Sequence, residues 1–157
     1  MKIFSFLLLG LFFTGSLLAE TLQVGDTLPS FTVENQHGES FTYEGQLDFL
    51  LVSFDMAAGK QTNVVLSEKP KNYLSEKKAA FLSNIYGMPS IGRYFALRKM
   101  RKYPHNILLG DSEDLLVNYP KEEGKVTVLK LDKDKKIEAI TFWDPTTENL
   151  DTLLTAN

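Results

Sequence analysis

The order of strand-like and helix-like segments constrains the fold of this chain more than any other feature of its sequence. Residues 48–54, Asp-Phe-Leu-Leu-Val-Ser-Phe, form a compact apolar run that predicts a strand buried on both faces. Further strands are expected over 79–85 and 106–109, and a closing hairpin over 126–131 and 137–142. Strands that alternate with helices predict an α/β sandwich, and the closing antiparallel hairpin makes its central β-sheet mixed.

Helix-like segments separate these strands and are expected to flank the sheet. The clearest covers residues 90–102, where Ser90 can cap the start and Pro104 ends the helix. Its apolar residues recur at near-helical spacing and predict a buried face, made of Ile91, Tyr94, Phe95 and Leu97. Shorter helices are expected over 60–67, after a cap at Asp111, and after a cap at Asp144 with Pro145 in the first turn.

The N-terminus has the layout of a secretory signal peptide. Lys2 precedes an apolar run over residues 3–13, and cleavage is expected after Ala19. The alternative is a membrane anchor, but the run is short for a bilayer of about 30 Å. The sequence therefore predicts a signal peptide over 1–19, a periplasmic or secreted protein, and no stable membrane insertion after cleavage.

The remaining residues, 20–157, predict one domain that opens with an N-terminal β-hairpin extension. Short alternating stretches over 32–34 and 39–43 surround a turn at Gln36-His37-Gly38. The chain is 43% hydrophobic, which suffices for a packed core and argues against disorder.

The chain contains no cysteine, which excludes disulfides, thiolate metal sites and thiol-disulfide chemistry. The only two histidines, His37 and His105, are far apart and show no metal-ligand spacing, so neither a metal nor a cofactor is expected. The formal charge of −3 becomes −4 when Lys2 is removed with the signal peptide, and this mild acidity argues against a nucleic-acid partner.

Three segments carry a resemblance to a known superfamily. Residues 24–31 with Gly38-Glu39 are similar to the entry segment of the peroxiredoxin and thiol-reductase branch of the thioredoxin-like superfamily. Residues 108–119 resemble its strand-to-helix step, and residues 126–134 resemble its closing hairpin. The resemblance implies a thioredoxin-like sandwich. Within this superfamily, the chain looks most like the YtfJ-type exported proteins. The similarity lies in Ala58-Gly59-Lys60, the helix ending in Lys-Tyr-Pro and the closing hairpin.

The resemblance also implies an active site, and this chain departs from it. In active relatives a cysteine or a Cys-x-x-Cys pair follows the buried strand at a helix N-terminus, where the helix dipole lowers the thiol pKa. The corresponding residues here are Gly59 and Thr62, and no proline stands near Val126, where the family has its cis-proline. The degenerate active-site positions are Ala58, Gly59, Lys60, Gln61, Thr62 and Val126.

The segment Gly59-Lys60-Gln61-Thr62 has two candidate functions. Backbone N–H groups at a helix start, with Lys60 beside them, could bind an anion, whereas the alternative is an ordinary helix start with a solvated lysine. Thr62 as a nucleophile would need a base, and nothing in the sequence brings His37 or His105 to it.

A cationic stretch without any acidic residue follows on the 90–102 helix. It contains Arg93, Arg98, Lys99, Arg101 and Lys102. Cations near a helix C-terminus favour the dipole, so part of this pattern is structural. We expect the stretch to dock a protein partner or an anionic surface such as lipid headgroups, and the alternative is a solvated helix face.

Together these features predict an exported, cysteine-less thioredoxin-like protein that acts as a non-catalytic binding or accessory protein. The alternative is a redox-system-associated enzyme that uses non-thiol residues near Asp55 or Gly59 to Thr62. An enzyme is expected to have a pocket with facing polar groups and a perturbed titratable residue, whereas a docking protein is expected to have an exposed apolar or cationic patch.

Overall fold

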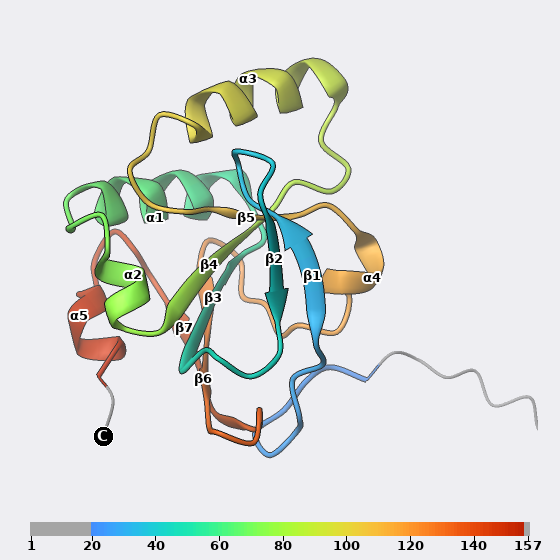
Figure 1. The fold of residues 1–157 in the computed structure, drawn as a ribbon, viewed down its shortest axis with the longest axis vertical. Helices are drawn as coiled ribbons and strands as arrows, with labels where there is room; N and C mark the ends of the chain where they lie inside the picture. The colour runs from blue at the N-terminus through green and yellow to red at the C-terminus, as the bar shows by residue number, and fades with distance from the viewer. Residues whose placement is uncertain (1–19, 156–157) are drawn as a thin grey trace, which may run out of the picture.

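A computed structural model describes residues 20–155 as a mixed five-stranded sheet flanked by helices, with a separate hairpin against one face (Figure 1). The strand order is β5-β4-β3-β6-β7. β3 pairs parallel with β4, and β4 pairs parallel with β5. On the other side, β6 pairs antiparallel with β3, and β7 pairs antiparallel with β6. The strands are β3 (Phe49–Ser53), β4 (Ala79–Asn84), β5 (Leu108–Gly110), β6 (Val126–Leu131) and β7 (Ile137–Trp143). The predicted mixed sheet is confirmed.

The central strand of the sheet is buried on both faces, because all its residues except Ser53 are apolar. All five residues of β3 are buried, and successive side chains enter different clusters. Phe49 and Leu51 pack against α1 (Met56–Ser67), α2 (Tyr73–Glu76) and α5 (Leu150–Leu153). Leu50 and Val52 pack on the other side, with the segment around Leu28, the hairpin and α4. Burying each such side chain contributes about 1.5–3 kcal/mol.

The hairpin consists of β1 (Phe31–Glu34) and β2 (Ser40–Tyr43), in the register expected for an antiparallel pair. This predicted N-terminal extension is confirmed. The hairpin lies in front of the sheet in Figure 1, and Tyr43 from it is fully buried in the core. α4 (Glu113–Leu116) contributes Leu116 to the same face.

Several predicted helix starts are wrong. α1 begins at Met56 rather than at residue 60, because the Asp55 carboxylate accepts the Ala58 N–H at 2.8 Å and caps the helix there. Asp111 caps nothing, since α4 begins after Ser112.

The last predicted helix also starts in the wrong place. Asp144 forms a local turn in which its carboxylate accepts the N–H and hydroxyl of Thr146. α5 begins only after Asn149, whose side chain accepts the Asp151 N–H. The leucine spacing of this segment predicts a buried stripe of Leu150, Leu153 and Leu154; Leu150 and Leu154 are buried, and Leu153 is partly buried against the same core. α2 was not predicted.

The largest correction concerns α3 (Ser90–Met100), which was expected to bury Ile91, Tyr94 and Phe95. α3 has no buried residue, and these three side chains are exposed by 76%, 63% and 60%. Its N-cap position is Pro89, not Ser90, and no side chain caps it. The helix lies across one end of the molecule, beyond α1 (Figure 1). The spacing of its apolar residues correctly predicts a helix. However, α1 already covers the sheet face against which those residues would be buried.

Two core clusters lie within the described part of the chain, one on each face of the sheet. Within that part, no helix is both long and apolar enough to cross a bilayer. The predicted signal peptide, residues 1–19, lies outside the described residues.

Candidate functional site

The predicted degenerate site lies in the first two turns of α1. Gly59 closes the first turn, and its N–H donates to the Asp55 carbonyl at 3.1 Å. A methyl group added at Gly59 would stand 3.2 Å from the Ser53 hydroxyl oxygen, so the position accommodates little beyond hydrogen. Since Gly59 and Lys60 follow the helix start rather than form it, and a carboxylate caps that start, the proposed anion-binding turn is wrong.

The other degenerate positions are structural or exposed. Ala58 is buried, whereas Lys60 and Gln61 are exposed on α1. Thr62 is fully buried and its hydroxyl donates to the Ala58 carbonyl at 2.8 Å, so it has no base and no access to a substrate. Val126 begins β6, fully buried and in register with Ser53 of β3.

His105 lies next to α1 but does not meet Thr62. Its Nε2–H donates to Asn63 Oδ1 at 2.8 Å, since the Asn63 amide already donates to the Gly59 carbonyl. The ring stacks on Tyr103 with centroids 5.4 Å apart, and Nδ1 has no partner among the described residues. Burial lowers the His105 pKa to about 4 because the charged form would lose its hydration. The imidazole is therefore neutral at pH 7.

Polar contacts hold α3 at both ends. Near its start, the guanidinium of Arg93 forms a bidentate ion pair with the Asp111 carboxylate, which raises the Arg93 pKa. After its end, Arg101 donates from Nε to the Gln36 carbonyl at 2.9 Å. Two of the five predicted docking cations thus serve to position the helix.

Gln36 holds the segment after α3 in position, a role that its place in the sequence does not predict. Its side chain is buried, donates to the His105 carbonyl at 2.8 Å and accepts the Ile107 N–H at 2.8 Å. These bonds fix the segment that follows α3 to the hairpin turn. A glutamine in a turn gives no sequence signal for such a contact, because its partners lie about seventy residues away.

A groove with a volume of about 300 Å³ lies between α1 and α3. Its apolar lining comes from Met56, Met88, Phe95, Ala96, Met100 and Tyr103. Its polar lining comes from Asp55, Lys60, Asn63, Ser83, Asn84 and Lys99. The groove therefore opens over the start of α1, next to Gly59, and Lys60 and Lys99 come from its two facing helices.

The polar groups of the groove do not form a catalytic arrangement. The Ser83 hydroxyl is bonded to the Ser53 hydroxyl at 3.3 Å, and Asp55 is engaged as the α1 cap. His105, whose pKa is strongly shifted, is buried and does not line the groove. A nucleophile beside a base is absent from the described groove residues.

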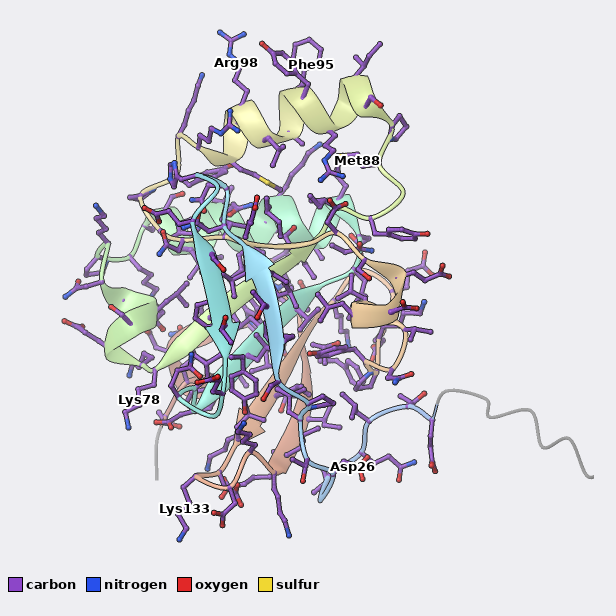
Figure 2. All side chains as sticks on the ribbon, turned by 45° about the vertical axis from the view of Figure 1, so that its right-hand side comes forward. Asp26, Lys78, Met88, Phe95, Arg98 and Lys133 are labelled. Carbon is purple, nitrogen blue, oxygen red and sulfur yellow. The ribbon has the colours of Figure 1, made fainter. Side chains whose placement is uncertain are left out.

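The outer side of α3 presents a mixed apolar and cationic surface. Figure 2 shows Phe95 and Arg98 on the side of α3 that points away from the body of the molecule. Arg98, Lys99 and Lys102 are exposed and form no ion pair with another described residue. No group of three His, Asp or Glu side chains among residues 20–155 is placed to hold a metal ion.

Solved structures identify the fold. The thioredoxin domain of a thiol-disulfide oxidoreductase from Bacteroides vulgatus is similar with a TM-score of 0.55 and 17% identity, over 86% of this chain and 100% of that one. A peroxiredoxin-like protein from Aquifex aeolicus is similar with a TM-score of 0.54 and 14% identity, over 85% of each chain. A thio-disulfide isomerase from Thermus thermophilus is similar with a TM-score of 0.53 and 19% identity, over 85% of this chain and 93% of that one. No family model and no curated protein matches the chain. The chain has a thioredoxin-like fold without a cysteine.

Proposed function

We propose that this is an exported, non-catalytic binding protein of the YtfJ type, whose groove between α1 and α3 holds an apolar segment of a partner polypeptide. The observation that carries the proposal is the groove itself. It opens over the start of α1 and has an apolar lining, while the residues around it lack a thiol and a base-activated nucleophile. A scaffold that offers a cleft without reactive groups is suited to binding.

The lining favours a polypeptide segment with an apolar side chain and nearby carboxylates. Met56, Met88 and Met100 are flexible and can adapt to side chains of different shape. Lys60 on α1 and Lys99 on α3 line the groove from its two sides. A carboxylate on the bound segment would meet a lysine at either side, whereas a lysine there would be repelled.

Export and an accessory role rest on the sequence. The apolar leader ending in Ala19 supports export, and the absence of cysteine supports a role beside thiol enzymes rather than as one.

A groove-filling variant tests the proposal. A Cβ added at Gly92 meets only Met88 Cγ at 3.8 Å, so Gly92→Leu puts a side chain into the groove without a backbone clash. Ala57→Leu is the matched control, since Ala57 is exposed on α1 and does not line the groove.

The probe is a short acetylated peptide with leucine and phenylalanine between glutamates, titrated by calorimetry. We expect binding to wild type and to Ala57→Leu, and at least a tenfold loss in Gly92→Leu. A peptide with lysines in place of glutamates should bind more weakly. Equal affinity for Gly92→Leu and wild type, or no binding to wild type, would refute the proposal.

A further inference from the structure

We propose that the outer face of α3 docks the protein on an anionic lipid bilayer. The face lies on the outer side of the helix, and only Phe95, at its edge, also lines the groove. It is formed by Ile91, Tyr94, Phe95, Arg98 and Lys102.

Helical geometry places these residues together. Positions 91, 94, 95 and 98 follow the i, i+3, i+4, i+7 spacing of one helical face, and Lys102 lies in the turn that follows the helix. The inward face is different: Arg93, Ala96, Leu97 and Met100 are all half-buried. The exposed apolar and cationic residues are therefore on one surface that the rest of the described molecule does not cover.

The chemistry along this face matches a lipid headgroup region. Its first two turns expose Ile91, Tyr94 and Phe95, and the two aromatic rings contact each other edge to face at 5.5 Å. Its last turn and the residues after it expose Arg98 and Lys102. Aromatic and aliphatic side chains beside Arg and Lys are typical of helices that lie in the plane of a bilayer surface. The long cationic side chains can keep their charge at the phosphates while the rings enter deeper.

Charge complementarity supports a negatively charged surface as the partner. Between Glu76 and Asp111 the chain contains no acidic residue, although its overall formal charge is −3. The acidic residues must therefore lie elsewhere, and Figure 2 shows Asp26 at the end of the molecule opposite Phe95 and Arg98. An anionic plane would therefore attract α3 without repulsion from an acidic residue on the helix itself.

Shape favours a bilayer over a folded acidic protein. α3 forms one end of the molecule, and the groove lies on its inner side (Figure 1). A single protruding helix offers a line of contacts to a flat surface, but no hollow that would receive a side chain of a protein partner.

The test is vesicle binding of residues 20–157, the chain that the predicted cleavage after Ala19 would leave. Vesicles contain phosphatidylglycerol with phosphatidylcholine, or phosphatidylcholine alone. Phe95→Trp serves as reporter, because the single native tryptophan, Trp143, is fully buried and keeps its emission constant. We expect a blue shift of the Phe95→Trp emission with anionic vesicles only, and loss of the shift in high salt.

Charge variants separate this face from general attraction. Arg98→Gln with Lys102→Gln should weaken vesicle binding about 10- to 30-fold, since each cation near an anionic surface contributes about a fivefold factor. Lys133→Gln with Lys136→Gln, which removes two exposed lysines at the other end, should change little.

Apolar variants test insertion. Ile91→Ser with Tyr94→Ser should reduce binding at least tenfold, whereas Val64→Ser with Val117→Ser, which also removes two exposed apolar side chains, should not. Ile91 and Tyr94 do not line the groove, so failure of the groove proposal would leave this one intact.

Three outcomes would overturn the inference. One is equal binding to neutral and anionic vesicles, and another is equal loss in the variant pairs and their controls. The third is binding to soluble polyglutamate through Arg98 and Lys102 without binding to vesicles, which would assign the face to an acidic polypeptide.

Discussion

His105 is the residue whose environment differs most from what its position in the sequence suggests. It follows the prolyl residue that ends a helix, yet it is 4% exposed, stacked on Tyr103 and bonded to Asn63. These contacts connect the segment after α3 to α1. The buried imidazole stays neutral because its surroundings offer Nδ1 no partner and no counter-charge.

We predict that His105 makes the stability depend on pH between about 6.5 and 4. The unfolded chain protonates this ring below its ordinary pKa of about 6.5, whereas the folded protein binds that proton only near pH 4. The folded state is therefore favoured fully above pH 6.5 and loses about 2 kcal/mol from this group as the pH falls to 4.5.

Carboxylates also titrate in this pH range, so the contribution of His105 is isolated by comparing wild type with His105→Gln. The variant should be less stable than wild type at pH 7, and the difference in urea-unfolding free energy should shrink by about 2 kcal/mol at pH 4.5. The exposed His37→Gln is the control. A constant difference between wild type and His105→Gln at both pH values would contradict the prediction.

At the scale of elements, α3 is a helix held by its ends. The pairs Arg93 with Asp111 and Arg101 with Gln36 add to the partial apolar packing of α3, in which Met100 contacts the core. Its exposed side chains therefore contribute little to the stability of the fold, although their spacing predicted a buried face.

We predict that Tyr94→Ala and Phe95→Ala each lower the free energy of unfolding by less than about 1 kcal/mol, because mostly exposed side chains bury little area. Phe81→Ala, in the fully buried β4, should cost about 3–5 kcal/mol. Chemical unfolding monitored by circular dichroism measures all three. A loss of more than 2 kcal/mol for Phe95→Ala would place this ring in a core after all.

Among residues 20–155, two glycines lie inside helices and give a matched pair. Alanine in place of a glycine inside a helix stabilises by about 0.5–1 kcal/mol when there is space. Gly92→Ala in α3 has that space, whereas Gly59→Ala in α1 brings a methyl group to 3.2 Å from Ser53 Oγ.

We predict that Gly92→Ala raises the midpoint of thermal unfolding and that Gly59→Ala gains less or lowers it. Adding Ser53→Ala to Gly59→Ala should recover part of the difference, because it removes the crowding oxygen. Equal midpoints of thermal unfolding for the two single variants would contradict the prediction, because they would mean that α1 and the strands beneath it move apart without cost.

At the scale of the whole molecule, the predicted signal peptide sets where the exported protein begins. We predict that the exported protein begins near Glu20, because the apolar run ends in Ser-Leu-Leu-Ala before it. N-terminal sequencing of protein recovered outside the cytoplasm measures this. An intact Met1 in a membrane fraction would contradict it.

The sequence by itself determined the sheet. The apolar run at β3, the closing hairpin and the N-terminal hairpin were predicted because strand burial and turn residues are local signals that pairing reinforces. The lack of thiol chemistry was equally certain, since no arrangement in space supplies a missing cysteine.

Only the tertiary structure decided which helix faces are buried. The spacing of Tyr94 and Phe95 predicts a face but not whether a partner surface remains for it, and α1 already occupies that surface. The groove and the contacts of Gln36 and Asn63 join residues that are distant in the chain. The same long-range contacts decide which cations position α3 and which stay exposed. Local patterns carry no information about such contacts, because they depend on how the elements pack.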